Sequence, residues 1–105
     1  MNILFDQGTP VPLRRYLAEH RITTTYERGW ASLANGHLLA QAERAGMDLL
    51  ITTDQNLRYQ QNLSARRIAI LVLRSTSWPK IQRRLDAIHA AIQRVGVGTY
   101  EEVEI

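Results

Sequence analysis

The chain has 105 residues, a formal net charge of +3 and no cysteine. This length builds one domain around a single core, and the lack of cysteine excludes disulfide scaffolds, thiolate metal sites and cysteine nucleophiles. The longest apolar run, Ile68 to Leu73, is far too short to cross a membrane, and no secretory signal is visible, so we expect a cytoplasmic protein without a membrane partner.

The positive charge is concentrated in the first 95 residues. Arginine supplies twelve of the thirteen basic residues, and three of the ten acidic residues lie in the last ten positions, which hold no basic residue. Guanidinium groups suit phosphate and carboxylate, and a basic domain can attract nucleic acid. No run exceeds two arginines, so solvated surface arginines in an arginine-rich proteome explain the same pattern.

The first third of the chain predicts strand, helix, strand. Residues 2–5 are an apolar first strand. Thr9 followed by Pro10 predicts an N-cap and a proline in the first turn of a helix over about residues 10–19. The segment 22–26 is rich in β-branched residues, which predicts a second strand.

A second helix and the central strand follow. Asn35 is placed as the N-cap of this helix, and Gly46 is placed to end it in the left-handed conformation. The third strand is predicted directly afterwards, at about residues 48–52. The apolar side of the helix is expected to consist of Leu38, Leu39, Ala42 and Ala45.

The rest of the chain begins with a polar segment after Asp54, predicted to form one or two helical turns. Residues 68–73 are apolar on both faces, which predicts a central fourth strand. Residues 75–79 open the longest predicted helix, and two glycines end it. Residues 100–105 predict a fifth strand at an edge of the sheet, where the glutamates would discourage pairing with another chain. The core stripe of that helix is predicted to be Ile81, Leu85, Ile88, Ile92 and Val95.

The alternation of short apolar strands with helices predicts one α/β domain over residues 1–105. Such an order favours a mostly parallel sheet of about five strands with helices on both faces. Ligands of open sheets of this kind bind at the carboxyl edge, where the strand order reverses.

Two acidic residues are placed to reach that edge. Asp6 and Asp54 each follow an apolar run that predicts a buried strand. Two carboxylates together suit Mg²⁺ or Mn²⁺, which could activate water and stabilise charge on a phosphodiester. Aspartate after a strand also forms turns and helix caps, so the pair has a structural interpretation as well. Polar neighbours that could contact metal-bound water, phosphate or substrate are Gln7, Asn35, Thr52, Thr53, Gln55, Asn56, Arg58 and Tyr59.

The other acidic residues are weaker candidates. Glu27 lies in the second loop, on the expected active edge. Glu43 is predicted to be solvated in mid-helix, and Asp48 begins a strand and so belongs at the opposite edge. Surface or packing roles are the simpler interpretation for His37, Trp30 and Trp78.

Three blocks of sequence carry a family resemblance. They are Ile3-Leu4-Phe5-Asp6-Gln7-Gly8, the segment 27–30 with 33–39, and Thr52-Thr53-Asp54-Gln55-Asn56-Leu57 continuing to residue 63. With these blocks the chain resembles the short bacterial PIN-like domains, which are related to toxin ribonucleases of toxin–antitoxin pairs and catalogued as a domain of unknown function.

The resemblance implies a Rossmann-like PIN fold in which an acidic cluster binds Mg²⁺ or Mn²⁺ and cleaves RNA. Asp6 and Asp54 match two family acids and would be catalytic metal ligands. Asn35 and Asn56 stand where many relatives have acids, and they would complete the metal site directly or through water. The resemblance also implies a homodimer and a small antitoxin partner. Expected substrate contacts are Gln7, Thr53, Gln55 and Arg58.

Two other functions stay open at this point. A catalytically silent PIN-like module would bind RNA or a protein partner, and the two asparagines favour it. A receiver domain of a signalling pathway would use Asp54 as phosphoacceptor. Receivers carry an acidic pair after the first strand and a lysine after the fifth, whereas here Gln7 follows Asp6 and the single lysine, Lys80, opens the last helix.

Overall fold

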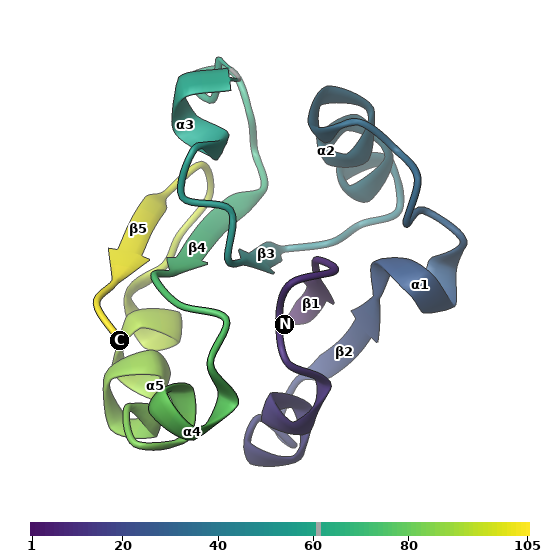
Figure 1. Ribbon diagram of the computed structural model, residues 1–105. Coiled ribbons are helices and arrows are strands. Elements are labelled where there is room, and N and C mark those ends of the chain that lie inside the picture. Colours follow the sequence, from purple (N-terminus) through teal and green to yellow (C-terminus); the bar gives the residue numbers. More distant parts are fainter. Residues whose placement is uncertain (61) are drawn as a thin grey trace.

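The sheet is five-stranded and entirely parallel, in the order β2-β1-β3-β4-β5 (Figure 1). The computed structural model describes residues 1–60 and 62–105; for Gln60 it describes the backbone but not the side chain. The alternation of strands with helices confirms the predicted α/β, Rossmann-like arrangement. The strands are β1 (Asn2–Phe5), β2 (Arg21–Thr24), β3 (Leu49–Thr52), β4 (Ala69–Leu73) and β5 (Tyr100–Val103).

Helices cover both faces of the sheet, as predicted. Successive strand residues point to opposite faces, so Ile3 and Phe5 join one core while Leu4 joins the other. The first core also takes residues from η1, α4 and α5, and the second takes residues from α2 and α3. The helical segments are η1 (Val11–Tyr16, a 3₁₀ helix), α1 (Thr25–Arg28), α2 (Asn35–Arg44), α3 (Leu57–Gln60), α4 (Trp78–Gln82) and α5 (Leu85–Arg94).

The strand order reverses beside β1. From β1 the chain steps outward to β2, then crosses to β3 on the other side of β1, and β4 and β5 continue in that direction (Figure 1). The carboxyl ends of β1 and β3 therefore lie side by side at the reversal point. In open parallel sheets this is the place where ligands bind.

The first helical segment differs from its prediction. It is a 3₁₀ helix that begins after Pro10 and ends at Tyr16. Thr9 does not cap it, because the buried Thr9 hydroxyl donates to the carbonyl oxygen of Ile51, at 2.9 Å. Thr9 thus ties the loop after β1 to β3.

The long helix predicted after β4 is divided into α4 and α5. The backbone N–H of Arg84 bonds to Ile81, three residues earlier, at 2.9 Å. Arg84 itself has φ −117° and ψ 24°, outside the helical region, so the α-helical ladder stops there. The apolar stripe survives the break, since Ile81, Ile88 and Ile92 are all buried.

Three smaller differences concern where elements begin and end. β2 stops at Thr24, because Thr24 and Glu27 form a capping box that starts α1. Asn35 is the first residue of α2, with Ala34 at the N-cap, and Ala45 is exposed rather than in the core. Gly46 adopts φ +79° after α2, as predicted. In the described parts of the chain, no helix has the length and apolar character needed to span a membrane.

Candidate active site

Asp6 is the first residue after β1, and the sheet fixes its position. Its backbone N–H extends the ladder to β3 by donating to the carbonyl oxygen of Ile51, at 3.0 Å. Its carboxylate accepts two hydrogen bonds. The N–H of Gln7 donates to Oδ1 at 2.8 Å, and the Thr52 hydroxyl donates to Oδ2 at 2.9 Å.

Asp54 lies two residues beyond the end of β3 and is equally well held. Its carboxylate Oδ1 accepts a hydrogen bond from the N–H of Asn56 at 2.9 Å, which closes an Asx-turn. Its Oδ2 accepts from the side-chain amide of Asn35 at 3.2 Å. Because Asn35 is the first residue of α2, this contact brings the start of that helix to the strand ends.

The hydroxyl of Thr52 connects the two aspartates. It donates to Oδ2 of Asp6 and accepts a hydrogen bond from the N–H of Asp54 at 3.1 Å. Thr52 is only 1% exposed, so water cannot replace either partner easily. The buried Thr52 side chain therefore holds the Asp6 carboxylate next to the turn that carries Asp54.

The donor set consists of two carboxylates and one side-chain amide. Each carboxylate oxygen accepts one hydrogen bond from the chain and keeps a second lone-pair direction. Oxygen ligands of this kind suit hard divalent cations, which often take one or two carboxylates and complete their shell with water and phosphate. Across residues 1–60 and 62–105, no group of three or more His, Asp or Glu side chains is arranged to hold a metal ion.

The loop after β1 packs closely against Thr53. A Cβ built on Gly8 would lie 2.2 Å from Oγ1 of Thr53, far closer than a Cβ atom approaches a non-bonded heavy atom. Glycine is therefore required for the loop to approach β3 this closely. Thr53, expected to contact substrate, is partly buried beneath this loop.

The other predicted contact residues reach different surroundings. Gln7 and Asn56 are exposed at the sheet edge. Gln55 is also exposed, and its Oε1 accepts a hydrogen bond from Nε of Arg74 at 3.3 Å. Arg74, which follows β4 directly, was absent from the sequence prediction. Like Asp6 and Asp54, Arg74 follows an apolar run that predicts a buried strand. This strand-end rule, a polar residue just after a predicted strand, could therefore have identified it.

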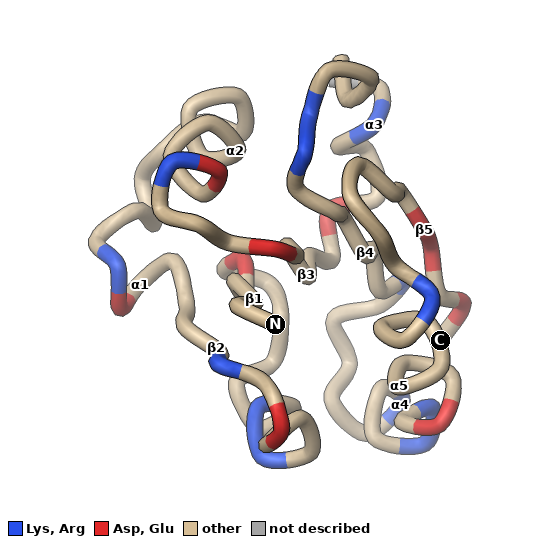
Figure 2. The backbone as a smooth tube through the Cα atoms, turned by 180° about the vertical axis from the view of Figure 1, so that it is seen from behind, with Lys and Arg blue, Asp and Glu red and all other residues tan. Residues whose placement is uncertain are grey.

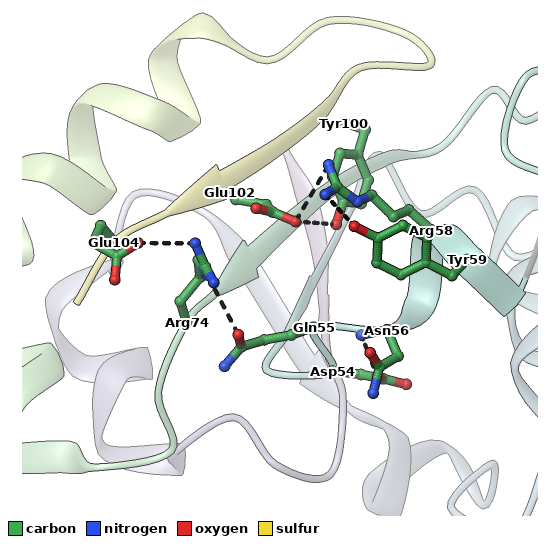
Figure 3. Close-up of polar contacts among 9 residues, drawn as sticks. All are labelled: Asp54, Gln55, Asn56, Arg58, Tyr59, Arg74, Tyr100, Glu102 and Glu104. Atoms are coloured by element: carbon green, nitrogen blue, oxygen red, sulfur yellow. Dashed lines mark hydrogen bonds and ion pairs between the residues drawn. The ribbon is translucent and has the colours of Figure 1, made fainter.

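Arg58 faces β5 rather than the aspartate pair (Figure 3). Its guanidinium lies 4.7 Å from the ring centroid of Tyr59 and 3.8 Å from Glu102. A hydrogen bond to the Tyr59 hydroxyl and the negative charge of Glu102 raise the pKa of Arg58 above its ordinary value. Burial, together with a hydrogen bond to Glu102, raises the pKa of Tyr100 to about 12.

Two other acids have structural roles. Glu27 bonds to Arg14 and caps α1, and the Arg14 hydrogen bond is the main reason why the pKa of Glu27 falls to about 2. Glu43 was expected to be solvated, but this prediction was wrong. Its carboxylate bonds to the Arg66 side chain at 2.8 Å and to the N–H groups of Arg67 and Ile68.

The remaining candidates lie at the opposite edge of the sheet, on the surface or against the cores. Asp48 is at the amino edge, as predicted, and accepts a hydrogen bond from the N–H of Asn2 at 2.8 Å. His37 is exposed, and the two tryptophans, Trp30 and Trp78, are partly buried against the two cores.

A cavity of about 610 Å³ lies at the amino edge, away from the residues predicted to bind metal or substrate. Its lining includes Met1, Met47, Asp48, Ile68 and Val97. The candidate active site is instead the group of side chains at the carboxyl edge. No protein-family model, curated protein or solved structure matches this chain.

Proposed function

We propose that this protein is a PIN-like, metal-dependent ribonuclease whose catalytic pair is Asp6 and Asp54. The observation that carries the proposal is the shared bond partner, Thr52. Its hydroxyl bonds to the Asp6 carboxylate and to the N–H of Asp54, and so supports a two-carboxylate site at the strand-order reversal.

In this proposal the two carboxylates hold Mg²⁺ or Mn²⁺, with Asn35 and Asn56 completing the site through their carbonyl oxygens or through water. The cation, when bound, supplies charge neutralisation at the phosphodiester and a water of lowered pKa. Asp6 and Asp54 would hold it, and the exposed side-chain amides of Gln7 and Gln55 would donate hydrogen bonds to phosphate oxygens.

Two asparagines in place of acids lower the negative charge of the site. Each substitution of a carboxylate by a neutral amide weakens the Coulomb attraction for a divalent cation. We therefore expect metal affinity weaker than that of a site with four carboxylates. Substrate phosphate would then contribute an important part of the coordination shell.

The test is a calorimetric Mn²⁺ titration of the wild type and of the Asp6→Asn, Asp54→Asn double variant, with and without a nonhydrolysable RNA analogue. Asparagine keeps one oxygen that can accept a hydrogen bond, such as the one from Thr52 to residue 6, but each substitution loses the second bond that the carboxylate accepts. Thermal melting of the double variant therefore shows whether the fold is retained. Asp48→Asn, at the opposite sheet edge, is the matched control. Binding that the double variant loses and the control keeps would support the site.

Cleavage is measured separately, on a fluorescently labelled RNA in Mn²⁺ and in EDTA. Metal-dependent cleavage should disappear in Asp6→Asn and persist in Asp48→Asn. Equal cleavage by the wild type and Asp6→Asn would contradict the assignment of Asp6.

A catalytically silent binding module is the second candidate. The observation in its favour is that all four carboxylate oxygens of the pair already accept hydrogen bonds from the chain, so both aspartates have a structural role. This candidate predicts RNA or antitoxin binding without cleavage, even at millimolar Mn²⁺. Light scattering of the purified protein, alone and with a candidate antitoxin, tests the proposed homodimer and partner.

A further inference from the structure

Two arginines beside the Asp54 loop pair with acids at the end of the chain, one in the last strand and one directly after it. Arg58 of α3 lies 3.8 Å from Glu102, and Arg74 lies 3.1 Å from Glu104 (Figure 3). Arg74 is also hydrogen-bonded to Gln55, the residue after Asp54. Figure 2 shows that β5 carries acidic positions whereas α3 carries a basic one.

The register of β5 delivers these acids to the active edge. β5 runs parallel to β4 with Glu102 opposite Val72, and the N–H of Arg74 bonds to the carbonyl oxygen of Val103 at 3.1 Å. Val103 packs in one core and Tyr100 against the other. Alternation along the strand therefore places Glu102 on the α3 side.

These ion pairs are partly exposed and can exchange. The Glu104 side chain is 73% exposed and that of Arg74 43%, whereas that of Arg58 is 46% and that of Glu102 23% exposed. Exposed pairs of this kind contribute little to stability. A guanidinium that binds a carboxylate also binds phosphate, since both present a pair of oxygens to the same fork of N–H donors.

We propose that Arg58 and Arg74 form a phosphate-binding site for the RNA backbone, and that Glu102 and Glu104 occupy it in the free protein as intramolecular phosphate mimics. The inference rests on the proposed function for the identity of the ligand. RNA entering the site displaces the two carboxylates, and its backbone then passes beside Gln55 toward Asp54.

The experiment measures binding without cleavage. A fluorescein-labelled single-stranded RNA is titrated with protein in EDTA, and its fluorescence anisotropy gives Kd, while a gel confirms that the RNA stays intact. Glu102→Gln and Glu104→Gln should each tighten binding about two- to fivefold, as expected for release of one exposed ion pair. Thermal melting of each variant shows whether it is folded.

Glu101→Gln is the matched control. It lies on the same strand and removes the same charge, but its partner is Arg94 of α5. Its affinity for RNA should change much less than that of the other two variants. An equal gain in all three would mean that net charge, and not release of Arg58 and Arg74, sets the affinity.

The arginines are tested through the salt dependence of binding. Arg58→Gln and Arg74→Gln should weaken binding and each reduce the slope of log K against log salt by about 0.7, the contribution of one phosphate contact on a single strand. Unchanged slopes, or no RNA binding by the wild type and by the Glu102→Gln, Glu104→Gln double variant, would overturn the proposal. RNA binding with this pattern but without metal-dependent cleavage would keep the phosphate site and refute the nuclease.

Discussion

The Thr52 hydroxyl donates a 2.9 Å hydrogen bond to Oδ2 of Asp6, and both residues lie at the ends of neighbouring strands. Thr52→Val keeps the shape and removes this donor. Because it removes the donor to Oδ2 of the partly buried Asp6 carboxylate and the acceptor of the Asp54 N–H, we expect the free energy of unfolding to fall by about 1–3 kcal/mol. Urea unfolding measures this loss.

The control for this change is Thr23→Val on β2. Thr23 is half-buried, and within the described residues its hydroxyl makes no hydrogen bond. Its variant should differ from the wild type by no more than about 0.5 kcal/mol. Similar losses in both variants would show that the Thr52 bond contributes no specific stability.

The contact between Gly8 and Thr53 predicts a coupled pair of mutations. Gly8→Ala places a methyl group 2.2 Å from Oγ1 of Thr53 and should cost about 1–3 kcal/mol through overpacking. Thr53→Ala removes the atom that clashes, so it should recover much of the loss in the double variant. A double-mutant cycle by urea unfolding measures the coupling; additive losses would exclude the clash.

Glu43 holds the segment before β4 through three hydrogen bonds. Burial alone would raise its pKa, but the bonds from Arg66, Arg67 and Ile68 outweigh burial and lower it. Glu43→Gln should cost about 1–3 kcal/mol in urea unfolding, because bonds to a charged acceptor are lost. Glu19 is 59% exposed, and its carboxylate lies 3.4 Å from His20 and 3.9 Å from His89. Exposed pairs of this kind contribute little to stability, so Glu19→Gln is the control and should be near neutral.

The same carboxylate makes stability depend on pH. Because the folded pKa of Glu43 lies below its ordinary value of 4.5, its contribution is present above pH 4.5 and is lost as pH falls through the folded pKa. Unfolding of the wild type should show this acid loss, and Glu43→Gln should show less of it. Identical pH profiles would contradict the assignment.

Glu27 should remain ionised in unusually acidic solution. Its pKa is about 2 because Arg14 donates to its carboxylate and the N–H of Thr24 bonds to it as well. Its contribution to stability is present above pH 4.5 and is lost as pH falls toward 2. Carboxyl-carbon NMR gives the titration midpoint directly, and Arg14→Gln should move it toward 4.5. A midpoint near 4.5 in the wild type would rule out this pairing.

The sheet was predictable because apolar strand runs are a strong signal. Residues 2–5 and 68–73 gave β1 and β4 with at most one residue of error. Helix ends were less predictable. Thr9 is a good N-cap residue by type, yet its hydroxyl bonds to Ile51, which is distant in sequence. Such a long-range bond overrides local preference, and no local pattern reveals it.

The site was predictable in part. The strand-end rule placed Asp6 and Asp54 correctly at one edge, and Asn35 does reach Asp54. The direction of Arg58 was not predictable, because it depends on Glu102, which only the register of β5 brings close. The link through Thr52 likewise depends on which strands are neighbours.

The placement of β1 between β2 and β3 has a consequence for how the protein folds. Asp6 and Thr52 are 46 positions apart, so their hydrogen bond closes a long loop. The chain loses the conformational entropy of this loop before the contacts between the two segments can form. β1 is the first strand to be synthesised, yet it is an interior strand of the sheet and pairs with β3 on one side. A nascent chain or proteolytic fragment that stops within α2 therefore carries Asp6 without Thr52 and Asp54, and the two carboxylates come together only when β3 pairs with β1.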